Sequence, residues 1–340
     1  MKNRALLIVV AAAVLAAAAL TLLYRGNRFF GPGPEATRRV IAIFKTVDYA
    51  GTPFWANVRD GVLSAARDFN IEVSLRGPEQ ESDIAGQIEI VHQAMEEKPD
   101  AIVLAAADFN LLVPLAREVR RRHIPLVCID SFINSDDADV RIGTDSYEGG
   151  QKLGAALVRY VKAGELVAVM SYVKGSSTAI DRESGARDFL KNRVRLLDTL
   201  YSQSDVEQAY KQAVTLIRLT PHLRGIIALN DPTARGVGRA LNESGKAAEI
   251  ALIGFDNSIE VVNFVERGII RDTVVQKPFN IGYLGIEMAR QLIDGKKPPR
   301  FINTGSVDIN RENMYQPENQ KLLFPVAPAA PVTPATGAHP

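Results

Sequence analysis

The chain has little cysteine, tryptophan or histidine, and no excess of charge of either sign. Its 340 residues include one Cys, one Trp and four His, and 40 Lys and Arg oppose 39 Asp and Glu. The single thiol, Cys128, excludes a disulfide framework within the chain. The histidines have no metal-ligand spacing, and a balanced charge exerts no bulk attraction on nucleic acid. We therefore expect no metal, no cofactor and no nucleic-acid partner.

Motifs that mark common enzyme classes are also missing. There is no Gly-x-Gly-x-x-Gly after the first predicted strand, no phosphate-binding Gly-Lys-Ser/Thr and no Gly-x-Ser-x-Gly. These absences weigh against a nucleotide-dependent enzyme and against a serine hydrolase. Composition points instead to a globular body, because 46% hydrophobic and 23% charged residues supply ample core for two domains or for one large two-lobed domain.

The N-terminus holds one long apolar run. A basic segment, residues 1–4, precedes the uncharged residues 5–24, and a helix of that length at about 1.5 Å per residue spans the hydrocarbon of a bilayer. The run is longer than the apolar core of about 7–15 residues in a secretory signal peptide, which favours an uncleaved anchor over residues 1–30. A cleaved signal segment, with release to the periplasm, is the alternative. No cysteine lies near the end of the run, which excludes a lipoprotein anchor.

Two segments rich in Gly, Pro and Ala flank the predicted body. Residues 31–37 are interpreted as a linker and residues 325–340 as a disordered tail, since neither holds enough apolar side chains to form a core. Between them, residues 38–324 alternate short β-branched runs with helical patterns, which is typical of parallel βαβ units. The expected strands are 40–44, 71–75, 101–104 and 125–129, followed by 166–170, 194–197, 225–229 and 250–253.

A stripe of five apolar residues at helical spacing lies between the first two strands and predicts a crossover helix. Its members are Val58, Val62, Ala65, Ala66 and Phe69. The second group of four strands repeats the first about 125 positions later, in the same order and with similar gaps. We therefore expect an α/β fold of two similar lobes, each built on a doubly wound parallel sheet.

The fourth strand of each group ends in the same way, with Asp130-Ser131 in the first and Asp256-Asn257 in the second. Ligands of open parallel sheets collect beyond the carboxyl ends of the strands. If the lobes face one another by these edges, both aspartates point into a shared cleft.

Three more candidates follow predicted strands. Lys45 follows the first strand, Asn230 follows the third strand of the second group, and Gln276 ends a later strand. Asn230 and its neighbour Asp231 also stand at the start of a helical pattern, so capping of that helix is an alternative role for either residue.

A further three candidates lie where loops enter helices. For Phe54 and Trp55, two roles fit: a hydrophobic staple at the helix entry, or an apolar wall for a ligand ring. Arg182 lies one turn into a helix after a Gly-Ser-Ser-Thr loop, and a surface salt bridge is its alternative role. Carboxylates, an arginine, amides, a lysine and aromatic faces together suit a small polyhydroxylated ligand.

These residues stand within a longer series of motifs. In chain order the motifs are Thr52-Pro-Phe-Trp-x-x-Val-x-Asp-Gly61, Lys98-Pro-Asp-Ala-Ile-Val103, Ile124-Pro-Leu-Val-x-Ile-Asp130, Ile142-Gly-Thr-Asp145, Ala228-Leu-Asn-Asp231 and Ile253-Gly-Phe-Asp256. Over nearly all of residues 38–310 the sequence resembles the type 1 periplasmic, ribose-binding-like family of sugar ABC transporter substrate-binding proteins.

The resemblance implies that seven candidates contact a sugar: two aromatics enclose the ring, an arginine makes a bidentate contact, three side chains bind hydroxyls and a glutamine closes the site. In that order they are Phe54 and Trp55; Arg182; Asp130, Asn230 and Asp256; and Gln276. The resemblance also implies three hinge strands, near residue 143, near residues 276–278 and near residues 304–307.

Two positions depart from the ribose-binding type. Ser131 follows Asp130 where pentose binders of the family carry arginine, and Lys45 differs as well. Both departures are similar to the autoinducer-2 receptor branch, so Lys45 and Ser131 join the predicted ligand-binding residues. A membrane-tethered sensor for a sugar or an autoinducer-2-like furanosyl signal is accordingly an alternative to transport.

The resemblance predicts an extracytoplasmic solute-binding protein, anchored at the outer face of the cell membrane, that binds a small sugar between its lobes and presents it to an ABC permease. Lobe 1 would comprise residues 38–143 and 277–305, and lobe 2 residues 144–276 and 306–324. The body is expected to be monomeric.

Two other functional classes have less support. A glycoside hydrolase would use Asp130 and Asp256 as its carboxylate pair, and no other feature of the sequence supports turnover. A sugar-responsive transcription repressor would need a helix-turn-helix before this core, whereas residues 1–37 offer an apolar span.

Overall fold

The computed structural model describes residues 37–324. The predicted anchor over residues 1–30, most of the predicted linker and the predicted tail over residues 325–340 lie outside this range. Among the described residues, no helix combines the length and the apolar character needed to cross a bilayer.

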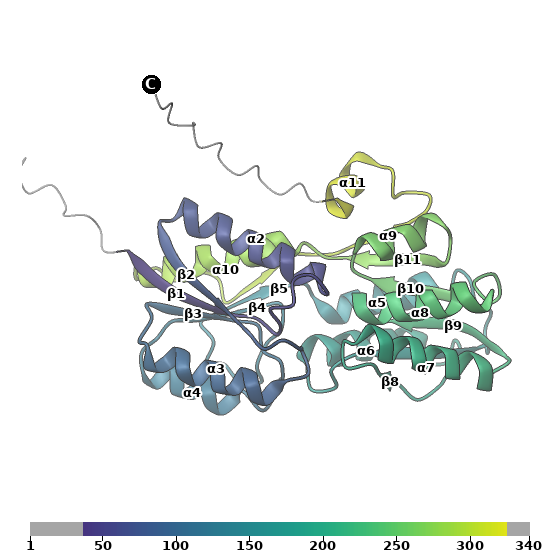
Figure 1. Cartoon of the computed structure of the whole chain (residues 1–340), viewed down its shortest axis with the longest axis horizontal. Helices are drawn as coiled ribbons and strands as arrows, with labels where there is room; N and C mark the ends of the chain where they lie inside the picture. The colour runs from purple at the N-terminus through teal and green to yellow at the C-terminus, as the bar shows by residue number, and fades with distance from the viewer. Residues whose placement is uncertain (1–36, 325–340) are drawn as a thin grey trace, which may run out of the picture. The chain divides into compact units, whose positions relative to one another are not determined.

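Six parallel strands form the sheet of lobe 1, in the order β12-β5-β4-β3-β1-β2. The strands are β1 (Arg38–Ile43), β2 (Ile71–Arg76), β3 (Ala101–Leu104), β4 (Leu126–Ile129), β5 (Val140–Gly143) and β12 (Phe301–Asn303). Helices cover both of its faces (Figure 1). On one face lie α2 (Pro53–Asp68) and α10 (Pro278–Ile293), and on the other α3 (Ile84–Glu96) and α4 (Val113–Arg121).

Strand β1 explains why both faces of this sheet must be covered. Val40 and Ala42 pack into the core beneath α2 and α10, whereas Ile41 and Ile43 pack into the core beneath α3 and α4. Successive side chains of a strand point to opposite faces, so a run without polar residues requires apolar layers on both sides.

Seven strands form the sheet of lobe 2, where six follow the order β13-β11-β10-β9-β6-β7 and β8 also pairs with β6. The strands are β6 (Leu166–Ser171), β7 (Arg195–Leu196), β8 (Leu200–Tyr201), β9 (Leu223–Ala228), β10 (Ala251–Phe255), β11 (Ile270–Val275) and β13 (Val307–Asn310). Helices α5 (Ser146–Leu157) and α6 (Ser177–Leu190) share one core with this sheet. The other core takes α7 (Val206–Leu219), α8 (Asp231–Ser244), α9 (Ile259–Glu266) and α11 (Pro317–Leu323).

The two-lobed α/β fold and its expected strands are confirmed, with small shifts at the strand ends and a shorter β7. Helix α2 buries Val58, Val62, Ala65 and Ala66 of the predicted stripe, and Phe69 ends the helix as its C-cap. The sheet of lobe 2 is not wholly parallel, because β13 pairs antiparallel with β11. Strand β13 continues from β12 of lobe 1. The carboxyl edges of the two sheets face each other. A chain that leaves the lobe 1 sheet at its carboxyl edge therefore enters the lobe 2 sheet at the carboxyl edge and runs opposite to the parallel strands there.

The described chain passes between the two sheets three times. These passages run from β5 to α5, from β11 to α10 and from β12 to β13. The Thr304 backbone N–H donates to the Gly143 carbonyl oxygen at 2.9 Å, so the first and third passages lie side by side. The passages stand where the resemblance implied hinge strands.

Glycines allow pairs of helices in each lobe to come into very close contact. A Cβ on Gly61 of α2 would lie 2.0 Å from the Phe279 carbonyl oxygen of α10, in lobe 1. A Cβ on Gly150 of α5 would lie 2.2 Å from the Arg182 carbonyl oxygen of α6, in lobe 2. Only glycine allows backbones to approach this closely. In lobe 2, the contact also sets the position of Arg182.

Candidate functional site

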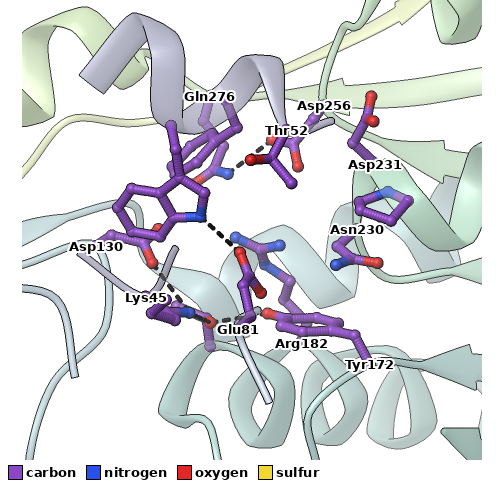
Figure 2. A pocket seen from close by; sticks show the side chains of 14 residues that line it. Lys45, Thr52, Glu81, Asp130, Tyr172, Arg182, Asn230, Asp231, Asp256 and Gln276 are labelled. Atoms are coloured by element: carbon purple, nitrogen blue, oxygen red, sulfur yellow. Dashed lines mark hydrogen bonds and ion pairs between the residues drawn. The ribbon is translucent and has the colours of Figure 1, made fainter. Parts of the chain in front are cut away.

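A pocket lies between the carboxyl edges of the two sheets. Fourteen side chains line it (Figure 2). Lobe 1 supplies Lys45, Thr52, Phe54, Trp55, Glu81 and Asp130; lobe 2 supplies Tyr172, Thr178, Arg182, Asn230, Asp231, Pro232 and Asp256; Gln276 stands at the passage from β11 to α10. The space among them that no protein atom fills is about 400 Å³, counting the part open to solvent.

The structure brings together eight of the nine residues predicted to bind the ligand. They are Lys45, Phe54, Trp55, Asp130, Arg182, Asn230, Asp256 and Gln276. The ninth, Ser131, does not line the pocket, so its predicted ligand contact is corrected. Its fully buried Oγ donates to Asp130 Oδ2 at 2.7 Å. Through this hydrogen bond, Ser131 holds the Asp130 carboxylate.

Asp130 and Asp256 end equivalent strands with the same backbone geometry. Their φ angles are +56° and +70°, in the left-handed region that non-glycine residues rarely occupy. The Asp130 N–H donates to the Ile142 carbonyl oxygen of β5, and the Asp256 N–H donates to the Val274 carbonyl oxygen of β11, at 2.8 and 2.9 Å. Such strain persists where surrounding structure holds a residue in place, and it is common at ligand sites. The same left-handed backbone conformation thus directs the carboxylate of each lobe into the pocket.

Lys45 is buried and joins the two lobes. Its ammonium lies 3.3 Å from Asp130 Oδ2 of lobe 1, 3.2 Å from Ser176 Oγ and 3.4 Å from Thr178 Oγ1 of lobe 2. Two of these contacts are hydrogen bonds to hydroxyls of lobe 2 and the third is an ion pair within lobe 1, so groups of both lobes hold the ammonium. Burial alone would lower the pKa of Lys45, but the Asp130 and Glu81 carboxylates outweigh it, and the pKa is raised. Lys45 therefore stays charged, and its contacts link the two lobes.

Arg182 is buried, and its guanidinium is only partly satisfied by the protein. Nη1 donates to the Leu229 carbonyl oxygen at 2.9 Å, the guanidinium lies 3.7 Å from the centre of the Phe255 ring, and Nε has no hydrogen-bond partner. The side chain is 3% exposed, so a surface salt bridge is the wrong interpretation. A buried donor without a partner costs about 1–3 kcal/mol. An oxygen-rich ligand in the pocket would remove that cost.

The carboxylate of Asp256 has different protein partners from that of Asp130. Its Oδ1 accepts a hydrogen bond of 2.7 Å from Gln276 Nε2 (Figure 2). Burial raises the pKa of Asp256 to about 6, although the nearby Arg182 guanidinium lowers it. Asp256 and Gln276 both line the pocket, so together they present a carboxylate acceptor and a side-chain amide to the same space.

Asn230 caps helix α8, as one interpretation of the sequence allowed. Its Oδ1 accepts from the Thr233 N–H at 3.2 Å, while its Nδ2 donates to Ser204 Oγ at 3.0 Å. Asp231 does not cap its own helix, because its Oδ2 accepts from the Ser258 N–H at 3.1 Å. Burial raises the pKa of Asp231 to about 7, and the Asp256 carboxylate contributes to the rise.

The two aromatics meet the pocket differently. Trp55 is 1% exposed and stacks on Phe44 of the lobe 1 core, with ring centres 5.4 Å apart. Phe54 is half-buried and meets Trp55 edge to face at 5.0 Å. Both residues line the pocket and also pack at the start of α2. The two predicted roles, hydrophobic staple and apolar wall for a ligand ring, are therefore compatible.

Sequence reasoning missed several lining side chains. Tyr172 follows β6, and its hydroxyl donates to Thr178 Oγ1 at 2.7 Å. The strand-end rule would have found Tyr172 had it been applied to the first strand of lobe 2. Glu81 lies in the loop between β2 and α3, where no local signal marks it. Its Oε1 accepts from Trp55 Nε1 at 2.5 Å and its Oε2 from Ser204 Oγ at 2.7 Å, so it too joins the lobes.

The pocket therefore offers acceptors, donors and an apolar face together. Carboxylates accept hydroxyl hydrogens, a guanidinium donates in parallel, and an aromatic ring covers C–H groups. Among the described residues, no cluster of three or more His, Cys, Asp or Glu could hold a metal ion. The arrangement suits the binding of a small polar molecule.

Comparison with known proteins agrees with this geometry. A model of the periplasmic binding protein domain matches residues 43–297. The ribose import binding protein of Bacillus subtilis is 23% identical over 272 residues, covering 80% of this chain and 88% of that protein. The D-allose-binding periplasmic protein of Escherichia coli is 24% identical over 278 residues, covering 78% of this chain and 87% of that protein.

Solved structures extend the comparison. An ABC transporter solute binding protein from Agrobacterium vitis with bound D-fucose has a TM-score of 0.81 and 33% identity, covering 84% of this chain and 100% of that chain. A carbohydrate transporter solute binding protein from Agrobacterium radiobacter in complex with D-arabinose has a TM-score of 0.82 and 27% identity, covering 85% and 99%. The family model spans most of the chain, and the chain therefore belongs to the periplasmic binding protein domain family.

Proposed function

We propose that this protein captures a small sugar or sugar-like ligand in the pocket between its lobes, on the extracytoplasmic side of the cell membrane. The observation that carries the proposal is the convergence of side chains from both lobes on one polar pocket. The relatives named above bind ribose, allose, D-fucose or D-arabinose. They are binding proteins, and this chain is likewise a binding protein and not an enzyme.

Recognition would depend on the groups that the protein leaves without full partners. Arg182 offers guanidinium donors, and Asp256 with Gln276 offers acceptors and an amide. Phe54 offers an apolar edge to the C–H side of a sugar ring. Hydroxyls placed differently would leave these buried groups unpaired, at about 1–3 kcal/mol for each.

Closure of the lobes would be the output of binding. A ligand shifts an open–closed equilibrium only through contacts that it makes better in the closed state, and a ligand here would touch both lobes. The three passages between the sheets would serve as the hinge. On this proposal lobe 1 comprises residues 38–143 and 277–305, and lobe 2 residues 144–276 and 306–324.

The closed form would be presented to an ABC permease. An uncleaved N-terminal anchor would raise the effective concentration of the protein near such a membrane partner. The alternative is a membrane-tethered sensor for a sugar or an autoinducer-2-like furanosyl signal, and Lys45 and Ser131 suggested the furanosyl signal. Ser131 does not line the pocket, and Lys45 is engaged by Asp130, Ser176 and Thr178, so these two residues give that signal little support.

A panel of sugars tests the proposal. The full chain is heated with D-ribose, D-allose, D-fucose or D-arabinose, with L-glutamate at equal concentration as the control ligand, and each hit is measured by calorimetry. A sugar at one hundred times its dissociation constant stabilises the folded state by about 2.7 kcal/mol, which raises Tm by several degrees. If no sugar raises Tm or gives binding heat, the proposed function is wrong.

A further inference from the structure

A second cavity lies directly beside the pocket, and we call it the outer cavity and the pocket itself the inner pocket. Segments 46–52 and 79–82 of lobe 1 and segment 203–208 of lobe 2 line the outer cavity. The space that no protein atom fills is about 840 Å³ there, against about 400 Å³ in the inner pocket by the same measure. Both figures count space open to solvent, and by this measure the outer cavity is the larger of the two.

Two side chains, Thr52 and Glu81, line both spaces. Glu81 is the partition between them, since one carboxylate oxygen accepts from Trp55 Nε1 of lobe 1 and the other accepts from Ser204 Oγ of lobe 2. Glu81 and Thr52 thus stand between the two spaces, and Glu81 is held there by two hydrogen bonds. A ligand that extends from the inner pocket into the outer cavity would pass these two side chains.

The lobe 2 wall of the outer cavity is a strained turn built onto the inner pocket. Gln203 and Ser204 are consecutive non-glycine residues with φ of +56° and +60°. The Gln203 N–H donates to the carbonyl oxygen of Tyr172, whose side chain lines the inner pocket. Surrounding structure must hold two such residues in succession, and ligand clamps are where this strain is found. The outer wall and the inner wall are thus parts of one structure.

We propose that the outer cavity is a second subsite that takes a neutral polyhydroxylated unit attached to the sugar in the inner pocket, such as the second residue of a disaccharide. This inference rests on the proposed function and deepens it. The side chains around the outer cavity include the carboxylates of Asp48, Glu79, Glu81 and Asp205. No Lys or Arg of the described residues lines it. Hydroxyl hydrogens suit such acceptors, whereas a phosphate or a uronic acid would meet like charge.

Matched ligands test the subsite on the full-length protein. Calorimetry compares D-galactose with melibiose and α-D-galactose 1-phosphate, and D-glucose with maltose and α-D-glucose 1-phosphate. We expect at least one disaccharide to bind at least tenfold more tightly than its parent sugar, and each phosphate to bind more weakly than its parent. The subsite is wrong if neither disaccharide gains tenfold over its parent. If neither these saccharides nor D-ribose, D-allose, D-fucose and D-arabinose bind, the proposed function itself fails.

Variants that fill the outer cavity test whether the tenfold gain in affinity depends on that cavity. Gln80 and Ser82 line the outer cavity and not the inner pocket, so Gln80→Trp and Ser82→Trp occupy the subsite alone, and Ser82→Ala is the matched control. We expect both Trp variants to abolish the tenfold gain while the parent sugar stays within threefold of its wild-type affinity. Ser82→Ala should preserve both affinities within threefold. The subsite is overturned if the gain survives in both Trp variants. It is equally overturned if parent and extended ligands weaken to the same degree, because the cavity would then be only an entrance.

Discussion

The two lobes make the same turn at the end of the same strand, yet they treat the resulting carboxylate differently. Asp130 of lobe 1 is ion-paired with Lys45 and hydrogen-bonded to Ser131. Among the described residues, Asp256 of lobe 2 accepts one side-chain hydrogen bond, from Gln276. The carboxylate of lobe 1 is held by an ammonium and a hydroxyl, and that of lobe 2 by a side-chain amide with a guanidinium nearby. The same backbone turn places a carboxylate in each lobe, and the neighbouring side chains determine which contacts each carboxylate makes.

The close helix pairs of the two lobes also differ in how they relate to the pocket. Gly61 lets α2 contact α10 in lobe 1, and Gly150 lets α5 contact α6 in lobe 2. Only the second contact lies against the backbone of a residue that lines the pocket, Arg182. Equivalent packing is therefore structural in one lobe and coupled to the site in the other.

The largest effect is expected from breaking the buried ion pair of lobe 1. Lys45→Met leaves Asp130 buried without its cation and should lower the free energy of unfolding by about 3–5 kcal/mol, measured by urea denaturation. Adding Asp130→Asn removes the uncompensated charge and should recover part of that loss. A loss below about 1 kcal/mol in the single variant would show that the lobes do not differ in this way.

The next largest effect is on the lobe 2 side of the pocket. Arg182→Ala removes the partly satisfied guanidinium and should weaken sugar binding by about 2–4 kcal/mol, roughly 30- to 700-fold, in calorimetry. Arg193→Ala is the matched control, since Arg193 is exposed and lies outside the pocket. An affinity of the Arg182 variant within threefold of wild type would remove Arg182 from the site.

Acid dependence should appear in lobe 2 through Asp231. Burial raises its pKa to about 7 in the folded protein, against ~3.9 in an unfolded chain. The folded state binds this proton more tightly, so the stability that the protonated group contributes is complete below about pH 4 and is lost as pH rises through 7. Relative to Asp231→Asn, which keeps an acceptor for the Ser258 N–H, wild type should lose about 2–3 kcal/mol between pH 5 and pH 7.5.

Urea denaturation at pH 5, 6 and 7.5 measures this difference. Asp198→Asn, at an exposed position, is the control, and its curve should run parallel to that of wild type. The interpretation fails if the Asp231→Asn curve is also parallel to wild type across the range.

The two glycine contacts give the smallest effect and the sharpest comparison. Gly61→Ala and Gly150→Ala each force a Cβ against a carbonyl oxygen and should lower the free energy of unfolding by about 1–3 kcal/mol. Only Gly150→Ala should also weaken sugar binding, because it displaces the turn of α6 that carries Arg182. Equal affinities in the two variants, measured by calorimetry on the folded proteins, would contradict the coupling of this helix pair to the pocket.

Local patterns predicted most of the fold. Alternating apolar runs located the strands, and a stripe from Val58 to Phe69 located α2, because burial of a strand or a helix face leaves a periodic trace. The side at which Asp130 and Asp256 lie also followed, since parallel strands end at one edge of a sheet. The antiparallel β13 did not follow, because its direction depends on how the second lobe faces the first.

The site was predictable in position and less so in detail. Strand ends identified Lys45, Asn230 and Gln276, but no pattern along the chain showed that the Lys45 ammonium is held by two hydroxyls and a carboxylate. Glu81 was missed because it lies in a loop, and its partners come from segments far away in the sequence.

By itself, the sequence determined the repeated α/β unit, the two acidic strand ends and the family resemblance, because periodicity and local motifs are properties of short segments. Only the tertiary structure decided which polar groups pair with one another and which stay open to a ligand. Hydrogen bonds and ion pairs depend on distances of a few ångströms between residues such as Lys45 and Thr178, which are brought together only when the lobes meet.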